Sequence, residues 1–535
     1  MVDGGRRTVG VAALPQKTED AILIRKRTKA EQSAFAKGRA AHADTLACGA
    51  IALFMFALLM LYAGKKSFFS DEMDQLGIIV RCGSLREVFA LYATMAHEVA
   101  PPLFAMAAFL WSRLMPLSQR WLQALPALAA CVGVFFVGRS GRLLSGKRTA
   151  VLASLLACAA PAMATTIGTQ FRQYGFVFLF ASLTVYAWLR RLRDPGKPRV
   201  CDIVLYGVAM AGLPYSHYLS VFVCFFLFAA DAVLFFKKRI PLSCVWSYVI
   251  GAALFAPWAF TILGTVMGIG SFWVPVPRLT DMRDALYFLT DTLSFRFFLY
   301  IGGLCTAAVT LLCHCGDGAE NRDKFVLFVL AAAAPVMIAL VFVYSRWLGD
   351  GISLFLPRYF LCTLPMVLLT CALFLGRLYA RLSAGRTKNA MAAAMSFLLI
   401  AGVLSGAAAW QNAQENASEI DEPYREAADW LSAQPDIYDA TTAVVTAGES
   451  QYVTAGWETL YVTQNGRRQG FAVFDRVRPF TAEDAARYGT VYVIQRLAAL
   501  GPKREETLAS LYAQDEKSAD NGAVWNVRRY TRIGN

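Results

Sequence analysis

Cysteine is absent from the last part of the chain and rare in one other segment. None of the 12 cysteines lies in residues 410–535, and residues 65–120 contain only Cys82. A disulfide framework needs several cysteines in one region, so we predict none for either segment. Cys313-His314-Cys315 has the composition of a metal site, but no second pair of ligands accompanies it. The sequence therefore predicts no metal site at this tripeptide.

Nucleotide-binding motifs and an N-terminal apolar core are also missing. The chain has neither a P-loop nor a dinucleotide-binding fingerprint, so no soluble nucleotide pocket is predicted. The first 44 residues carry nine Lys and Arg and no long apolar core, which is not the pattern of a cleavable signal peptide. We expect residues 1–44 to form a basic cytoplasmic tail.

What the chain does have is an excess of apolar residues. Hydrophobic residues make up 57% of the 535, against about 45–50% in soluble globular proteins. Several uncharged runs reach the roughly 20 residues that cross about 30 Å of hydrocarbon. The net charge of +14 lies in short clusters between these runs, so the positive-inside rule explains it without a nucleic-acid partner. These patterns predict a polytopic α-helical membrane protein that contacts membrane lipids.

The apolar runs predict eleven transmembrane helices. They lie at residues 45–64, 121–138, 149–167, 174–190, 200–216, 218–236, 241–265, 296–314, 325–345, 358–376 and 390–409. With the N-terminus inside, the tail and the cytoplasmic loops together hold 27 Lys and Arg, as the positive-inside rule requires. An odd number of spans leaves the C-terminus outside, which in a bacterial inner membrane is the periplasm.

Three regions follow from this map. Residues 45–409 form a transmembrane module, and residues 410–535 form a small external α/β domain. Within the module, residues 65–120 form one long external loop, because Pro101–Met115 is too short to be a span and fits an interfacial helix better. In the last region we expect helices at Glu422–Ala433, Ala482–Arg487 and Arg504–Ala513, and strands at Ala443–Thr446, Val491–Gln495 and Val524–Tyr530.

This topology places most of the ionisable candidates on the external side. They are Asp71, Glu72, Asp74, His97, Glu98, Arg172, Tyr174, Tyr215, His217, Tyr218 and Arg358. Several of them lie in short turns at membrane depth. Ionisable groups at that depth are costly and usually face a cavity or a partner.

Each candidate also has a structural interpretation. Asp71 and Glu72 can cap an interfacial helix. Arg172 can extend to the lipid headgroups, and Arg358 can act as an interfacial anchor. His217 can be a hydrogen-bonded packing residue between its tyrosine neighbours. The residues alone leave these alternatives open.

As a set, the candidates suit glycosyl transfer from a lipid phosphate. A carboxylate can take the proton of an acceptor hydroxyl while that hydroxyl attacks a sugar carbon. Arginines can neutralise the departing phosphate, because their planar donors match its oxygens. A lipid phosphate lies at the headgroup level, where Arg172 and Arg358 are expected.

Six short motifs carry a resemblance to a known family. In order, they are Ser70-Asp71-Glu72, His97-Glu98-Val-Ala-Pro101-Pro102-Leu103, Phe171-Arg172-Gln-Tyr174, Tyr215-Ser-His217-Tyr218, Phe272-Trp273-Val-Pro275 and Pro357-Arg358-Tyr359. With this order the chain resembles the glycosyltransferases of the GT-C fold that use polyprenyl-phosphate sugars. These are the relatives of the lipid A aminoarabinose transferase and of the protein O-mannosyltransferases. The resemblance covers about residues 45–376.

The resemblance implies roles for several of these residues. It implies a single inverting displacement with Asp71 as general base and Glu72 as its helper. It also implies Arg172, Tyr174 and Arg358 around the donor phosphate. The candidate substrate-binding residues further include His97, His217 and Tyr218. Glu98-Val-Ala interrupts the family's His-Pro-Pro pattern after His97.

The resemblance also implies the partners. We expect a polyprenyl-phosphate sugar as donor and a lipid, glycan or protein as acceptor. No cofactor is expected, although Asp71-Glu72-Met-Asp74 can alternatively hold a divalent cation. The competing function is a transporter or flippase for a lipid or lipid-linked sugar. The two related halves that many transporters have are not evident in the sequence.

Overall fold

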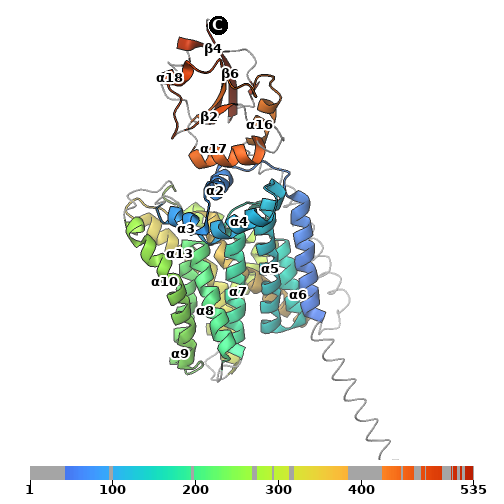
Figure 1. The fold of residues 1–535 in the computed structure, drawn as a ribbon. Helices are drawn as coiled ribbons and strands as arrows, with labels where there is room; N and C mark the ends of the chain where they lie inside the picture. Colours follow the sequence, from blue (N-terminus) through green and yellow to red (C-terminus); the bar gives the residue numbers. More distant parts are fainter. Residues whose placement is uncertain are drawn as a thin grey trace, which may run out of the picture.

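The computed structural model describes residues 43–94, 101–193, 198–267, 274–291, 295–312, 319–382, 424–447, 450–462, 471–475, 477–496, 508, 510–514, 519–520 and 525–533. The predicted tail lies almost entirely outside these residues, as does the predicted span at 390–409. The described part is a helical bundle with a small sheet beyond one of its ends (Figure 1). Short helices lie between the bundle and the sheet.

Eight helices of the described part are long and apolar enough to cross a membrane. They are Ala43–Tyr62, α5 (Gln119–Ser145), α7 (Tyr174–Arg193), Tyr218–Phe236, Leu242–Leu263, α12 (Phe295–Leu312), Asp323–Leu348 and Pro357–Tyr379. The fourth combines the 3₁₀ turn η2 (Tyr218–Ser220) with α9 (Val221–Phe236), and the fifth runs from η3 (Leu242–Cys244) into α10 (Val245–Met267). The seventh lies within α13 (Ala319–Val343) and η4 (Tyr344–Leu348), and the eighth lies within η5 (Pro357–Thr363) and α14 (Leu364–Leu382). Each lies at a predicted span, and the chain is a multi-pass membrane protein.

Two other predicted spans differ in the structure. The prediction of one helix over residues 149–167 is wrong, because the stretch divides into α6 (Lys147–Cys158) and the π-helical turn η1 (Met163–Ile167). Pro161 lies at the break, and a proline disfavours helical conformation in the residue before it. The predicted span at 200–216 is α8 (Val200–Ser216), a helix of 17 residues and thus shorter than the other eight.

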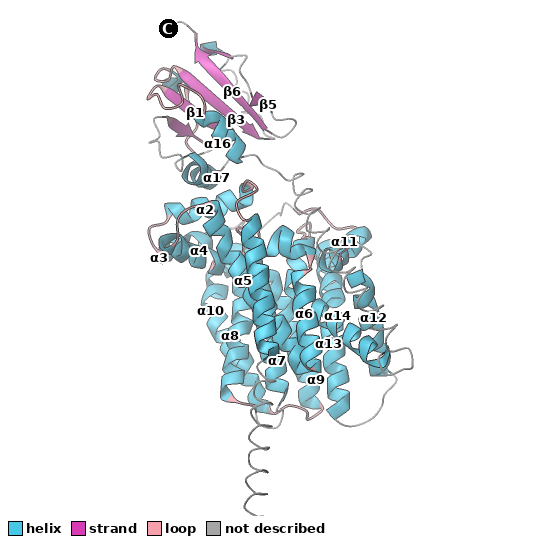
Figure 2. Cartoon of the chain, turned by 90° about the vertical axis from the view of Figure 1, so that its right-hand side faces the viewer, coloured by secondary structure: helices cyan, strands magenta, loops and turns pink. Residues whose placement is uncertain are grey.

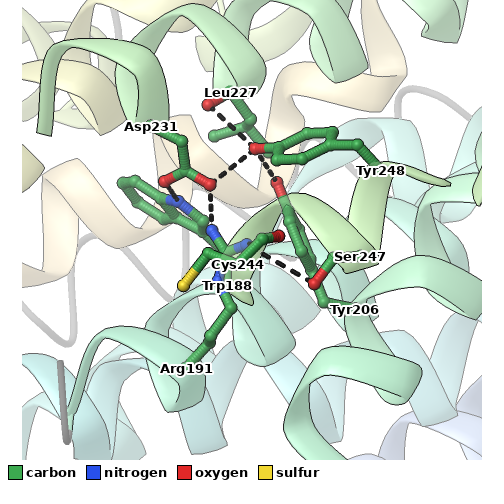
Figure 3. A network of polar contacts seen from close by, with 8 residues as sticks. All are labelled: Trp188, Arg191, Tyr206, Leu227, Asp231, Cys244, Ser247 and Tyr248. Atoms are coloured by element: carbon green, nitrogen blue, oxygen red, sulfur yellow. Dashed lines mark hydrogen bonds and ion pairs between the residues drawn. The ribbon is translucent and has the colours of Figure 1, made fainter. Parts of the chain in front are cut away.

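A polar network joins α7, α8, α9 and α10 inside the bundle (Figure 3). Asp231 of α9 accepts hydrogen bonds from Trp188 Nε1 at 2.8 Å and from Tyr248 OH at 2.6 Å, and it pairs with Arg191. The hydroxyls of Tyr206 and Tyr248 are 3.3 Å apart. Since the carboxylate of Asp231 has three partners, its burial does not leave it uncompensated. The network therefore fixes four helices to one another and lies near the predicted cytoplasmic loops.

Within the predicted external loop of residues 65–120, the described residues form short helices, as expected. They are α2 (Ser70–Arg81), α3 (Leu85–Thr94) and α4 (Leu103–Leu114). All three lie at the end of the bundle that faces the sheet (Figure 1). α4 occupies the apolar stretch at Pro101–Met115 and is only 12 residues long, which agrees with an interfacial helix.

The C-terminal region is an α/β domain, as predicted. Its strands are β1 (Thr442–Ala447), β2 (Ala472–Phe474), β3 (Thr490–Arg496), β4 (Tyr512–Gln514), β5 (Ala519–Asp520) and β6 (Trp525–Arg532). They form one sheet in the order β2-β1-β3-β6-β4, with β5 also paired to β6. β1 is parallel to β2 and β3, and β6 is antiparallel to its neighbours. β1, β3 and β6 match the three predicted strands.

Helices of the C-terminal region pack between its sheet and the bundle. They are α16 (Tyr424–Ser432) and α17 (Gln451–Trp457) with the π-helical turn η7 (Glu458–Val462). The short helix α18 (Ala482–Ala485) packs on the other face of the sheet, away from the bundle (Figure 1). α17 lies directly against α2, as both views indicate (Figures 1 and 2). The predicted helix at Arg504–Ala513 lies partly outside the described residues, and its last two residues, Tyr512 and Ala513, belong to β4 instead.

Candidate active site

The first turn of α2 carries the acidic pair at the sheet-facing end of the bundle. The backbone is extended at Phe69 (φ −92°, ψ 173°), and the helix begins at Ser70. Asp71 is its second residue, and its side chain is 38% exposed. Carboxylates in a first turn interact favourably with the positive end of the helix dipole. The sequence thus forms a helix start that presents a partly exposed carboxylate.

Glu72 has a different environment from Asp71. Its Oε2 accepts the Phe69 N–H at 3.2 Å, and its Oε1 accepts the Phe171 N–H at 2.5 Å. Burial raises the pKa of Glu72 to about 8, although these two N–H groups and Arg172 act in the opposite direction. Glu72 is a helix cap, as one interpretation of the sequence proposed, and it also ties α2 to the segment before α7.

Two arginines from distant parts of the sequence meet Asp71. Arg172 Nη1 donates to the backbone carbonyl of Asp71 at 3.0 Å, and Arg172 Nη2 lies 3.6 Å from Asp71 Oδ2. Arg358 Nη2 lies 3.8 Å from the same Oδ2. Arg172 is buried and turned into the protein, which argues against its extension to lipid headgroups. Arg358 follows Pro357 in η5, and its side chain is 28% exposed.

His217 packs between aromatic rings close to these arginines. Its ring centroid lies 4.6 Å from that of Tyr359 and 6.4 Å from that of Tyr174. Burial and the positive charges of Arg358 and Arg172 lower the pKa of His217 to about 3. The imidazole is therefore neutral around pH 7.

The hydrogen bonds of His217 determine which ring nitrogen carries the proton. Nδ1 accepts the Leu219 N–H at 3.3 Å, so the neutral ring has its proton on Nε2. Nε2 is buried and has no hydrogen-bond partner among the residues that the structure describes. An unsatisfied buried donor costs about 1–3 kcal/mol. This N–H is available to an acceptor on a ligand.

The structure brings several of the predicted site residues together. Asp71, Arg172 and Arg358 are in contact, and His217 with Tyr174 adjoins the two arginines. Tyr218 opens η2 beside His217 and is half-buried. Two predicted residues, His97 and Glu98, lie outside the described residues, as does part of the motif at residues 272–275.

The three carboxylates of Asp71-Glu72-Met-Asp74 do not converge as ligands of one cation. Asp71 faces the arginines, Glu72 accepts two backbone N–H groups, and Asp74 Oδ1 accepts the Ser450 hydroxyl at 2.7 Å. Among the described residues, no group of three or more His, Cys, Asp or Glu side chains is placed to hold a metal ion. Cys313-His314-Cys315 lies outside these residues.

Sequence reasoning missed residues that shape this site. Tyr359 belongs to a motif noted in the sequence, and its ring forms one wall beside His217. Tyr461 and Arg425 from the C-terminal region contact the segment just before α2. No sequence signal connects them with Asp71, since more than 350 positions separate them from it.

This arrangement can take up a proton and bind an anion. Asp71 supplies a partly exposed carboxylate, and two guanidinium groups lie within 4 Å of it. Guanidinium groups bind phosphate and carboxylate with paired hydrogen bonds. The Nε2–H of His217 is a neutral donor in the neighbourhood of the two arginines.

Comparison with solved structures identifies the fold. ArnT from Cupriavidus metallidurans bound to undecaprenyl phosphate matches with a TM-score of 0.57 and 13% sequence identity, over 91% of this chain and 98% of that one. The arabinofuranosyltransferase AftD from Mycobacteria has a TM-score of 0.46 and 14% identity, over 91% of this chain and 40% of that one. The oligosaccharyltransferase AglB from Archaeoglobus fulgidus, in complex with an inhibitory peptide and a dolichol-phosphate, has a TM-score of 0.47 and 12% identity. This match covers 84% of this chain and 69% of that one.

The similarity to ArnT extends over nearly the whole of both chains. No protein-family model matches the sequence, and a search of curated proteins gave no match. At 13% identity the similarity to ArnT is evidence of fold. The chain has the GT-C fold predicted from its motifs, with the added α/β domain.

Proposed function

For a multi-pass membrane protein with the GT-C fold, we propose glycosyl transfer from a polyprenyl-phosphate sugar to an acceptor hydroxyl at the external face. The observation that carries this proposal is the contact of the Asp71 carboxylate with Arg172 and Arg358. It combines a base with a cationic site for phosphate. ArnT, which has the same fold, was solved with undecaprenyl phosphate, and this supports a lipid phosphate as the carrier of the sugar.

In the proposed reaction, Asp71 is the general base. It takes the proton of the acceptor hydroxyl while the hydroxyl oxygen forms a bond to the anomeric carbon. The bond between that carbon and the phosphate oxygen breaks, and polyprenyl phosphate leaves with the electron pair. Arg172 and Arg358 stabilise the charge on the departing phosphate. A single displacement of this kind inverts the configuration at the anomeric carbon.

Donor binding also prepares Asp71 for this role. In the structure both arginines interact with Asp71 Oδ2, at 3.6 and 3.8 Å. A phosphate group carries more negative charge than one carboxylate and competes for the same guanidinium donors. When Arg172 and Arg358 turn toward the phosphate, the Asp71 carboxylate loses these ion pairs and can accept a hydrogen bond from the acceptor hydroxyl. The base is thus released only where the donor is present.

The other site residues contact the substrates in this proposal. The buried Nε2–H of His217 donates to a donor phosphate or sugar oxygen. Tyr174 and Tyr218 line the donor site beside it. His97 keeps the substrate-binding role that the resemblance implies. Glu72 has both oxygens engaged by backbone N–H groups, so it acts as a positioning residue instead of a second base.

The proposed orientation follows the charge distribution of the sequence. We infer a cytoplasmic N-terminus and a catalytic face outside, in the periplasm for a bacterial inner membrane. Residues 45–409 form the transmembrane module in this proposal, and residues 410–535 the external domain. The acceptor belongs to the cell envelope and is a lipid, a glycan or a protein. The reaction is proposed to need no metal cofactor.

Two measurements test this function. Mass analysis compares envelope glycolipids and glycoproteins from cells that contain the protein with those from an isogenic strain that lacks it. We expect loss of one sugar modification in the strain without the protein. The purified protein in liposomes should then transfer that sugar from its polyprenyl-phosphate donor, with inverted configuration in the product. Movement of the lipid-linked sugar between leaflets without transfer would favour the transporter alternative and overturn the proposal.

A further inference from the structure

The helix that carries Asp71 is in backbone contact with a helix of the C-terminal domain. α2 and α17 cross where Gly77 faces Gly456, which leaves no room for a side chain on either helix. A Cβ atom at Gly77 would lie 1.7 Å from the backbone oxygen of Tyr452. A Cβ atom at Gly456 would lie 2.2 Å from the backbone oxygen of Met73. Real Cβ atoms do not approach backbone so closely, so either substitution requires the helices to separate.

Polar contacts from the same domain hold the chain on both sides of Asp71. Before α2, Tyr461 OH accepts the Phe68 N–H at 2.8 Å. Arg425 donates to the backbone carbonyls of Gly64 at 2.8 Å and Lys66 at 3.0 Å. After Asp71, the Ser450 hydroxyl donates to Asp74 at 2.7 Å. The domain therefore contacts the entry to α2 and its second turn directly.

An apolar core continues from the loop helices into the C-terminal domain. One cluster contains Phe68, Met73 and Leu76 from the first loop together with Trp457 and Leu460 from the domain. These five side chains are almost completely buried. Alternate residues of β1 and β3 divide between this cluster and a second one on the other face of the sheet. The domain is thus packed onto α2 by shared core, and not merely tethered to the bundle.

We infer that the C-terminal domain positions Asp71, so that Gly456 and Tyr461 are positioning residues of the proposed active site. This inference rests on the proposed function. From the bundle side, α2 is held by Glu72, whose Oε1 accepts the Phe171 N–H, and by Arg172, which donates to the Asp71 carbonyl. From the other side it is held by Tyr461, Ser450 and the crossing at Gly456. Contacts from the bundle and from the C-terminal domain therefore together fix the position of the Asp71 carboxylate between Arg172 and Arg358.

A small displacement of α2 is enough to affect the reaction. A misplacement of about 1 Å can lower a rate by about 100-fold, because proton transfer depends on close alignment of donor and acceptor. Gly456→Ala forces α17 away from Met73 and releases the first turns of α2. The phosphate site formed by Arg172 and Arg358 belongs to the bundle and keeps its place. Positioning by the domain thus predicts a lower kcat with little change in KM for the donor.

The test compares Gly456→Ala with Gly489→Ala in the full-length protein. Gly489 lies in the same domain, and a Cβ atom there meets nothing within 4 Å. We expect Gly456→Ala to lower kcat at least 10-fold with KM for the donor changed less than 3-fold, and Gly489→Ala to match the wild type. Tyr461→Phe, which removes only the hydroxyl that accepts the Phe68 N–H, should lower kcat several-fold. It serves as the second variant if Gly456→Ala does not fold.

Hydrogen exchange of the α2 amides provides a readout that does not depend on sugar transfer. We expect faster exchange in residues 64–81 of Gly456→Ala and Tyr461→Phe, with unchanged exchange in α7. Wild-type kcat in both variants would overturn the inference, whether or not exchange rises. A fall in kcat with unchanged exchange in residues 64–81 would also overturn it. If exchange rises but neither the wild type nor any variant transfers sugar, the proposed function is wrong, while the positioning of α2 by the C-terminal domain is still supported.

Discussion

Arg172 holds Asp71 by its backbone and by its side chain at once. Nη1 donates to the Asp71 carbonyl at 3.0 Å, and Nη2 lies 3.6 Å from the carboxylate of the same residue. The first contact fixes α2 against the segment before α7. The second is an ion pair that an incoming phosphate can replace. In the proposed mechanism, the guanidinium group of Arg172 therefore both positions the base and binds the donor phosphate.

Asp71→Asn should abolish sugar transfer. Asparagine keeps the shape of the side chain but cannot accept the proton, so we expect kcat to fall by about 10²–10⁴-fold. Binding of polyprenyl phosphate should persist, because the arginines remain. Glu483→Gln, a change at an exposed carboxylate of the C-terminal domain, is the matched control. A purified Asp71→Asn protein with near-normal turnover would remove Asp71 from the role of base.

Arg172→Ala should impair the use of the donor more than the structure of the protein. Loss of a guanidinium group that binds phosphate is expected to raise KM for the donor and to lower kcat/KM by about 100-fold. Arg283→Ala removes an exposed arginine of α11 (Leu279–Thr290) and should leave both constants unchanged. Titration with polyprenyl phosphate measures binding separately. If Arg172→Ala reduces only insertion into the membrane, the headgroup interpretation is correct.

His217→Gln should retain more activity than His217→Phe. The amide of glutamine can donate a hydrogen bond in place of the Nε2–H, whereas phenylalanine has no donor. The lowered pKa of His217, about 3, also predicts that this residue does not titrate between pH 5 and 8. The two variants should therefore differ by a factor that is constant over this range. Equal activity of both variants would assign His217 to packing.

Glu72 should make the folded protein less stable as the pH rises from about 4.5 to 8. Burial raises the folded-state pKa of Glu72 from its ordinary value of about 4.5 to about 8, so in this window the folded state binds more protons than the unfolded state. Stability then falls with increasing pH. Thermal unfolding in detergent should show this slope in the wild type and a flatter one in Glu72→Gln. Parallel slopes in the two proteins would contradict the raised pKa.

Chelation should leave sugar transfer intact. The carboxylates of Asp71, Glu72 and Asp74 are engaged by separate groups, so the proposed mechanism assigns the phosphate charge to the arginines. Activity after treatment with EDTA, and after addition of Mg²⁺ or Zn²⁺, is the measurement. Loss of activity that a divalent cation restores would establish the cation alternative.

Single cysteines test the orientation of the chain in the membrane. Position 483 is exposed in the C-terminal domain. Position 237 is exposed and directly follows α9, at the far end of the membrane-length helix that begins beside His217. In cells that carry the protein with its 12 native cysteines replaced by serine, an impermeant thiol reagent should label the variant Glu483→Cys and should label Lys237→Cys only after the membrane is opened. The reverse result would place the candidate active site in the cytoplasm.

The sequence by itself determined the membrane class, most of the helices and the kinds of residue in the site. Long uncharged runs have one stable solution in a bilayer, since a helix satisfies its own backbone hydrogen bonds there. That rule located eight long helices. The apolar run at Pro101–Met115 was assigned as an interfacial helix and not as a span because of its length alone. The rule failed at residues 149–167, because the hydrophobicity of this stretch does not show that the helix breaks at Pro161.

Only the tertiary structure decided how the site residues act. Asp71 and Glu72 are adjacent in sequence, yet one faces two arginines and the other is buried against backbone N–H groups. Neighbours on a helix point in different directions, so their environments depend on what packs around the helix. The same holds for Gly456, which meets α2 only because distant segments share one apolar core. Such long-range contacts leave no periodic pattern in a single sequence, so they can be identified only from the tertiary structure.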